Sequence, residues 1–319
     1  ERLAPRYAHV SRFGGFDASI LFEERLAEEA DPATIAAAPA YLRAFYDRLK
    51  AGRPEPYYAL LHADGDNMGT VIDNQPDAEA HRALSAALDH FAAGVRQTVE
   101  EVHSGALVYA GGDDVLAFLP LDSALACARQ LASQFEIVLR NYKNAGGLSP
   151  TLSVGMVICH HVEPLADALN LARAAERAAK DLTNKNGLAI TLSKRSGADR
   201  TIRGSWASDF VDRLDQLIRL HRAEAIPDGA AYDLRSLSDR LHQGGNRPDP
   251  GLLRAEAIRI VGRKRGLRGN AVEQNAELVQ LAEALPSTEE EARVRNWDVT
   301  AFANELIVTR EFARALGPA

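Results

Sequence analysis

Apolar residues recur with two different spacings between residues 57 and 193, and the two spacings alternate along the chain. Short apolar runs predict buried strands, whereas longer segments with apolar residues three and four positions apart predict helices. The predicted strands are 57–63, 106–110, 115–120, 151–160 and 187–193, and the predicted helices are 79–102, 122–142 and 164–182. Asp122 or Ser123 is expected to cap the second helix, and Pro164 suits the first turn of the third.

The order of these elements is β-α-β-β-α-β followed by α-β. The first six elements match the ferredoxin-like split βαβ arrangement, in which an antiparallel sheet carries its helices on one face. The predicted fold class is therefore α+β, a ferredoxin-like βαββαβ domain followed by an all-α C-terminal domain. In this arrangement the first strand lies beside the hairpin strands at the centre of the sheet. Asp64, at the end of the first strand, is thus predicted to meet the Asp113–Asp114 turn of the hairpin.

Helical patterns dominate both ends of the chain. Segments 18–30 and 32–52 show helical spacing and form a predicted helical approach segment, 1–56. Further helical patterns occur at 206–224, 232–243, 251–264, 275–285 and 297–316, with a loop at 244–251. The regular pattern breaks at "RSGADRTIRGSW", so a boundary is predicted near 196–206, which divides the rest into 57–200 and 201–319.

Four carboxylates occur at two predicted turns. Asp64 and Asp66 follow the first strand in "LLHADGDNMG", and Asp113 and Asp114 complete "AGGDD" in the hairpin. Gathered together, they would repel one another unless a positive charge lay among them. Magnesium binds oxygen ligands, and paired metals can activate an attacking hydroxyl and stabilise a leaving pyrophosphate. The pair of motifs therefore favours a metal site, although each motif alone is equally compatible with a solvated turn.

Glycines flank these acids. Gly111 and Gly112 permit the positive φ of a tight hairpin turn, and with Gly65 they leave room for backbone to approach a triphosphate. A nucleotide-binding turn is therefore predicted beside the metal site.

Composition excludes several classes of protein. Hydrophobic residues make up 46% and charged residues 25% of the 319 residues, which is typical of a globular protein. The net charge of −7 argues against a surface that binds nucleic acid everywhere by charge. Cys127 and Cys159 are too far apart for a zinc motif and are expected to be buried. No apolar run is long enough for a bilayer, so a cytoplasmic location without membrane contact is predicted.

The segments "LLHADGDNMG", "LVYAGGDDVLAFLPL", "TLSVGMVICHHVEPL", "ARAAERAAK" and "LSKRSG" resemble the large subunit of type III CRISPR effector complexes of the Cmr kind. The resemblance covers its second palm domain, about 57–197, and more weakly the C-terminal helical domain. It implies synthesis of cyclic oligoadenylates from ATP, with Mg²⁺ or Mn²⁺, when the complex holds target RNA. It implies Asp64 and Asp113 as leading metal ligands and catalytic residues, supported by Asp114 and Asp66.

The resemblance also implies nucleotide contacts. Gly111 and Gly112 would form the nucleotide-contacting turn, and Lys180, late in the helix before the last strand, would meet the triphosphate. Ser85 and Ser153 are candidates for base or ribose contacts, with a buried structural role as the equal alternative.

Two other polar motifs have less specific interpretations. His160 and His161, which precede Glu163, are expected to be structural or to contact a partner, since no second cluster completes a metal site. "KRSG" at 194–197 is expected to bind phosphate or to cap the edge of the sheet.

The complete subunit of this family also has an HD nuclease domain, a first palm and a zinc-binding region, and none is recognisable here. The chain begins at Glu1, so a fragment of a longer subunit is one expectation, and the isolated chain can be inactive because cyclisation uses two palms. The expected partners are other effector subunits, guide RNA, target RNA and ATP. The alternatives are a non-catalytic palm scaffold, a diguanylate-cyclase-like enzyme and metal-dependent nucleic-acid cleavage.

Overall fold

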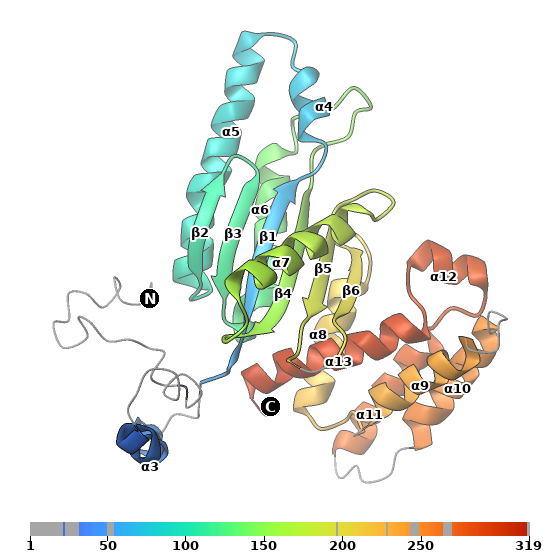
Figure 1. The fold of residues 1–319 in the computed structure, drawn as a ribbon. Helices are drawn as coiled ribbons and strands as arrows, with labels where there is room; N and C mark the ends of the chain where they lie inside the picture. The colour runs from blue at the N-terminus through green and yellow to red at the C-terminus, as the bar shows by residue number, and fades with distance from the viewer. Residues whose placement is uncertain are drawn as a thin grey trace.

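The computed structural model describes residue 22 and residues 32–49, 54–195, 197–227, 229–242, 249–263 and 270–317. A six-stranded sheet with strand order β2-β3-β1-β4-β5-β6 forms its centre, and a group of helices lies beyond β6 (Figure 1). The strands are β1 (Tyr57–Gly65), β2 (Ala106–Gly111), β3 (Asp114–Leu119), β4 (Leu152–His160), β5 (Gly187–Leu192) and β6 (Arg200–Ser205).

Helices connect and follow these strands. Before and within the sheet region they are α3 (Pro32–Leu49), α4 (Met68–Asp73), α5 (Ala78–Arg96) with a π-helical extension η3 (Gln97–Val102), α6 (Leu121–Leu139) and α7 (Leu165–Lys180). After the sheet they are α8 (Phe210–Arg222), α9 (Ala230–His242), α10 (Pro250–Arg263), α11 (Asn270–Glu283), α12 (Glu289–Arg295) and α13 (Val299–Leu316).

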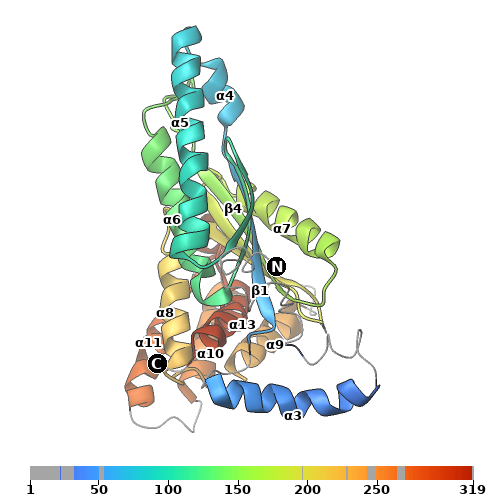
Figure 2. The ribbon, with the colours of Figure 1, turned by 90° about the vertical axis from the view of Figure 1, so that its left-hand side faces the viewer.

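The predicted βαββαβ order is confirmed. β1 pairs antiparallel with both β3 and β4, so it lies at the centre of the sheet next to the hairpin. α5 and α6 cover one face, where Leu61 and Met156 of the sheet pack with Phe91 and Phe135 of the helices. α7 connects the parallel strands β4 and β5 and covers the opposite face, as Figure 2 shows. Alternate residues of each strand therefore face different helices.

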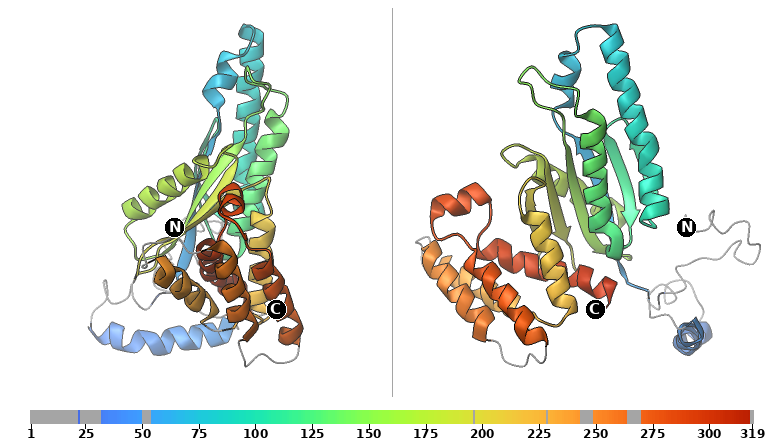
Figure 3. Two further views of the ribbon diagram at one scale, coloured as in Figure 1. Left: turned by 90° about the vertical axis from the view of Figure 1, so that its right-hand side faces the viewer. Right: turned by 180° about the vertical axis from the view of Figure 1, so that it is seen from behind.

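The sheet continues past the predicted last strand. β6 pairs antiparallel with β5, so residues 200–205 are part of the sheet and not only a break before the helical region. α8 packs on the same face as α6, and Figure 3 shows both helices from behind. Phe210 of α8 and Phe312 of α13 are buried in the core that α5 and α6 share with the sheet. The sheet region and the first and last C-terminal helices thus form one continuous core.

The other C-terminal helices have a second core. Leu217, Leu278 and Phe302 are among its fully buried members. At its edge the guanidinium of Arg213 donates two hydrogen bonds of 2.8 Å to the carboxylate of Glu305, where both side chains are buried. This paired charge ties α8 to α13, and breaking such a pair would leave one charge buried alone.

Several local predictions need correction. Pro120, and neither Asp122 nor Ser123, occupies the N-cap of α6, and its side chain makes no capping hydrogen bond. The Ser123 hydroxyl instead donates to the carbonyl of His103 at 2.8 Å. α4 and α12 were not predicted. The predicted helix at 32–52 is present as α3, whereas segment 18–30, apart from residue 22, and most of the loop 244–251 lie outside the described residues.

Both cysteines are buried and free, as expected. Within the described ranges, no helix is long and apolar enough to cross a membrane.

Candidate functional site

The acidic residues of β1 and β3 lie on the face that α7 covers. Ala63 pairs with Val115, and both belong to the core on the α5 and α6 side. Because side chains alternate along a strand, Asp64 and Asp114 point to the other side of the sheet. The structure therefore brings the two predicted carboxylates together at one end of neighbouring strands.

The hairpin turn is tighter than the sequence suggested. Gly111 pairs with Asp114, which leaves Gly112 and Asp113 as the two turn residues. Gly112 adopts φ 61°, the left-handed conformation that favours glycine. Gly111 lies in β2 without a positive φ, so the prediction of a special backbone conformation is wrong for this residue. A Cβ atom at Gly111 would lie 2.3 Å from the hydroxyl oxygen of Tyr109, so its glycine makes room for that ring.

Gly65 lets the end of β1 approach the hairpin turn. A Cβ atom at this position would lie 2.6 Å from the Oδ2 atom of Asp113. Burial raises the pKa of the Asp113 carboxyl, the charge of Asp114 raises it further, and the backbone N–H groups of Asp113 and Gly65 oppose the shift. Burial is thus the main cause of the raised pKa, and the neighbouring negative charge that the sequence predicts at this turn adds to it.

Lys180 reaches the same acids from the last residue of α7. Its ammonium contacts the carboxylate of Asp64 and lies 3.2 Å from that of Glu176. Burial, followed by the nearby ammonium of Lys185, lowers the pKa of Lys180 to about 8. A positive charge therefore lies where the resemblance expects a triphosphate to bind.

Sequence reasoning missed Glu176 and Lys185. Glu176 is buried, and burial, followed by the charges of Asp66 and Asp114, raises the pKa of its carboxyl against the opposing charge of Arg177. Lys185 lies in the loop between α7 and β5 with φ 53°. A Glu four residues before Lys180, and a lysine in a short polar loop after it, were the available signals.

Asp66 has a different environment from the other acids. It is fully buried, and its carboxylate accepts hydrogen bonds from the hydroxyls of Thr151 at 2.7 Å and Ser153 at 2.9 Å. It also accepts from the backbone N–H of Asn186 at 3.0 Å. Asp66 thus joins the end of β1 to the start of β4 and to the loop that carries Lys185. Its predicted contact with nucleotide remains a prediction.

An Asp66→Asn substitution is expected to lower the free energy of unfolding by about 1–3 kcal/mol. The new amide N–H₂ group would replace one carboxylate oxygen, and the hydroxyl and N–H donors that this oxygen now accepts from would lose their acceptor. Urea denaturation measures this change. Asp89→Asn, on the exposed surface of α5, is the matched control and is expected to change stability by less than about 0.5 kcal/mol. Equal stabilities for the two variants would contradict the structural role of Asp66.

The two predicted serines occupy contrasting places. Ser153 is fully buried and its hydroxyl donates a hydrogen bond to Asp66. This agrees with the buried structural role that was the alternative to a base or ribose contact. Ser85 is exposed on α5, and its contact with a base or ribose remains a prediction.

The carboxylates at this end of the sheet are candidate metal ligands. In the part of the chain that the structure describes, no group of three or more His, Cys, Asp or Glu side chains is arranged to hold a metal ion. Magnesium commonly takes only one or two carboxylates and completes its coordination with substrate phosphates and water. Asp64, half-buried beside Asp113 and Asp114, offers hard oxygen donors of this kind. The donor set fits a metal that arrives with a nucleotide.

The remaining polar motifs lie away from this edge. His160 is buried and packs edge-on against Tyr57 with ring centroids 5.1 Å apart, in line with a structural histidine. Lys194 lies 2.6 Å from the carboxylate of Glu311 and so ties the end of β5 to α13.

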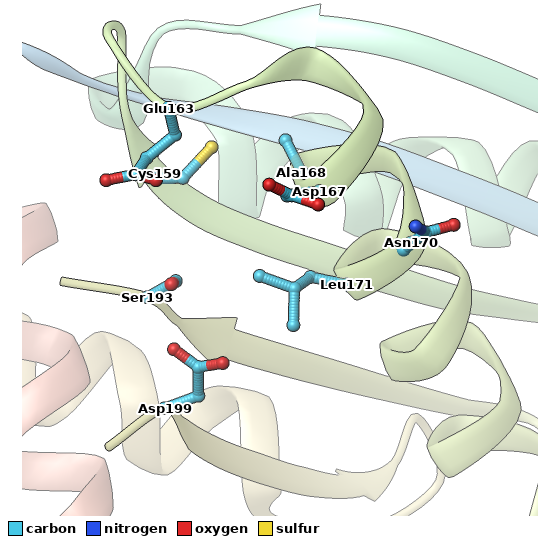
Figure 4. A pocket seen from close by; sticks show the side chains of 8 residues that line it. All are labelled: Cys159, Glu163, Asp167, Ala168, Asn170, Leu171, Ser193 and Asp199. Carbon is cyan, nitrogen blue, oxygen red and sulfur yellow. The ribbon is translucent and has the colours of Figure 1, made fainter. Parts of the chain in front are cut away.

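A hollow of about 350 Å³ lies near the start of α7, at the opposite end of the sheet from Asp64 (Figure 4). It is lined by Cys159, Glu163, Asp167, Ala168, Asn170, Leu171, Ser193 and Asp199. None of the predicted catalytic or nucleotide-binding residues lines it.

Comparison with known proteins identifies relatives of this region. The family described as "Cas10/Cmr2, second palm domain" matches residues 57–189. The "CRISPR system Cmr subunit Cmr2" of Pyrococcus furiosus is 37% identical over 200 residues, which are 54% of this chain and 22% of that protein. The chain therefore spans only about a fifth of the length of this relative.

Solved structures show the same fold. The cryo-EM structure of the Type III-B Cmr-beta bound to cognate target RNA has a TM-score of 0.54 at 15% identity, covering 87% of this chain and 41% of the other. The Csm1-Csm4 cassette in complex with cA4 has a TM-score of 0.51 at 16% identity, covering 81% and 37%. At these identities the likeness establishes the fold alone.

Proposed function

Residues 57–189 belong to the Cas10/Cmr2 second palm domain family, and from this premise we propose that the chain is a nucleotidyltransferase of a type III CRISPR effector complex. It uses ATP and Mg²⁺ or Mn²⁺ to make cyclic oligoadenylate in response to target RNA. The 3′-hydroxyl of one adenylate attacks the α-phosphorus of the next ATP, so that a new P–O bond forms as the bond to pyrophosphate breaks and the hydroxyl proton passes to solvent. A last attack of the same kind, by the 3′-hydroxyl on the α-phosphorus at the 5′ end of the same chain, closes the ring and releases pyrophosphate.

One observation carries this proposal: at the end of β1 that lies beside the hairpin, the carboxylate of Asp64 contacts the ammonium of Lys180 from α7. Asp64, Asp113 and Asp114 would hold the divalent metal. When bound, the metal would neutralise phosphate charge and orient the attacking hydroxyl and the leaving group. Lys180 would then exchange its contact with Asp64 for the triphosphate, where its charge favours the negative charge of the leaving pyrophosphate.

The partners follow from the same family membership. Other effector subunits, guide RNA and target RNA are proposed to surround the palm and to switch it on. One protein of similar fold is a Type III-B Cmr-beta complex bound to cognate target RNA, and another is a Csm1-Csm4 cassette in complex with cA4. These structures support the proposal by analogy of fold alone. The chain covers less than half of either protein.

The test is incubation of the chain, alone and assembled with its effector subunits and target RNA, with labelled ATP and Mg²⁺ or Mn²⁺. Products are resolved by mass, and GTP replaces ATP in the matched control. We expect cyclic oligoadenylate from the assembled complex only when metal and target RNA are both present, with EDTA removing the activity.

Each contrary result would exclude this function and indicate one of the alternatives. Tight ATP binding without any product in the complete complex would indicate a scaffold. A cyclic guanine dinucleotide would indicate a diguanylate-cyclase-like enzyme, and shortened RNA without nucleotide polymerisation would indicate a nuclease.

A further inference from the structure

One flank of α7 carries a stripe of positive charge. Arg173, Arg177 and Lys180 recur four and three residues apart, so they lie on the same side of the helix. Arg173 and Arg177 are exposed, and among the described residues neither forms an ion pair. The stripe therefore presents two arginines to solvent next to a lysine that contacts the catalytic acids.

The stripe faces β1 and β3. Lys180 contacts Asp64 at the end of β1. His62, two residues earlier on the same side of the strand, feels the positive charges of Arg173, Arg177 and Lys180 and the negative charge of Asp114. His62 is therefore within electrostatic reach of both arginines of α7 and of Asp114. The arginines are near the proposed reaction centre, although they belong to none of the contacts assigned above.

The charges of Arg173 and Arg177 repel each other, and the buried carboxylate of Glu176 offsets part of the charge of Arg177. Like charges four residues apart on a helix destabilise it by about 0.2–0.5 kcal/mol. Guanidinium groups bind phosphate oxygens in pairs and suit nucleic-acid backbones. The seven residue-to-residue steps from Arg173 to Lys180 span about 10 Å, enough for more than one phosphate group. Lys180 and Lys185 lie at the end nearest the acids, so the arginines are left for phosphates farther along a chain.

We propose that Arg173 and Arg177 bind the phosphodiester backbone of the short oligonucleotide that is being extended. This inference rests on the proposed function, under which that oligonucleotide is the nascent, 5′-triphosphorylated oligoadenylate. Its 3′ end lies at the acids beside the incoming ATP, and its earlier phosphates follow the stripe toward the middle of α7. The arginines thereby affect how long the product stays bound and how far it grows.

The experiment uses a double variant that carries both Arg173→Gln and Arg177→Gln in the assembled complex. A second double variant, Arg82→Gln with Arg140→Gln, is the control. Arg82 is exposed on α5 and Arg140 is exposed at the C-cap of α6, and these two helices cover the other face of the sheet. The probes are linear 5′-triphosphorylated triadenylate, α,β-methylene-ATP and a 20-nucleotide single-stranded RNA without a triphosphate, each titrated at several salt concentrations.

We expect the double variant to bind triadenylate about 10-fold more weakly and the ATP analogue nearly as well as the wild type. The slope of log affinity against log salt for triadenylate should fall by about 1.4, because two phosphate contacts are lost from a single strand. Under turnover, the variant should release shorter products, while the control complex behaves like the wild type.

Unchanged triadenylate binding, no triadenylate binding by the wild type, or equal weakening in the control would overturn the inference. Weakening of the RNA alone would assign the stripe to guide or target RNA and would overturn it as well. The proposed function fails separately, when the wild-type complex makes no oligoadenylate from ATP, because the binding measurements do not depend on turnover.

Discussion

An Asp114→Asn variant is expected to lose oligoadenylate synthesis by about 100- to 1000-fold, the range found when a group that stabilises transition-state charge is removed. Its melting temperature in EDTA should nevertheless be equal to that of the wild type or higher. The reason is that the charge of Asp114 raises the pKa of both Asp113 and Glu176 in the structure, so it repels its neighbours when no metal is present.

Magnesium distinguishes the two roles of this residue. A metal that binds only the folded protein stabilises it, and the stabilisation grows with the logarithm of the metal concentration once that concentration exceeds the dissociation constant. Magnesium with an ATP analogue should therefore raise the melting temperature of the wild type and change that of Asp114→Asn far less. Asp89→Asn, exposed on α5, should retain both the synthesis and the shift. An Asp114→Asn variant that keeps the metal-dependent shift would show that this carboxylate is not a metal ligand.

The frame of this site could be predicted from the sequence because it depends on local patterns. Short apolar runs at 57–63 and 115–120 assigned the strands, and the Gly-Gly-Asp-Asp segment between two apolar runs assigned the hairpin. The known order of a βαββαβ sheet then placed Asp64 beside Asp114, as the pairing of β1 with β3 confirms. Each of these steps needs only the pattern of neighbouring residues and the known strand order of the βαββαβ fold.

The parts that could not be predicted depend on contacts between distant segments. In β6 only Ile202 is buried, because an edge strand has a single well-covered neighbour, and its sequence therefore resembles a loop. Glu176 follows two alanines on a helix and would normally be assigned to solvent. Its burial results from the close approach of α7 to β4, which the helix sequence alone does not reveal.

Gly155 is the residue that permits this close approach, and Gly155→Ala is expected to destabilise the protein by about 3 kcal/mol, at the upper end of the usual cost of overpacking. A Cβ atom there would lie 2.0 Å from the backbone nitrogen of Glu176 and 2.5 Å from the carbonyl oxygen of Ala172. Both contacts are with the backbone of α7, so no change of side-chain rotamer can relieve them, and the helix must move away from β4. Urea denaturation measures the loss.

Movement of α7 would also displace Lys180 from Asp64, because the helix is the support of that lysine. Misplacement by about 1 Å can cost about 100-fold in rate, so synthesis by Gly155→Ala should fall even at temperatures where the variant is folded. Gly94→Ala is the matched control, since nothing lies within 4 Å of a Cβ atom at this position in α5. Because alanine is favoured over glycine in the interior of a helix, Gly94→Ala should raise the stability of the protein by about 0.5–1 kcal/mol and leave synthesis unchanged. A Gly155→Ala variant as stable and active as Gly94→Ala would mean that α7 does not depend on Gly155 to hold Lys180 against the acids.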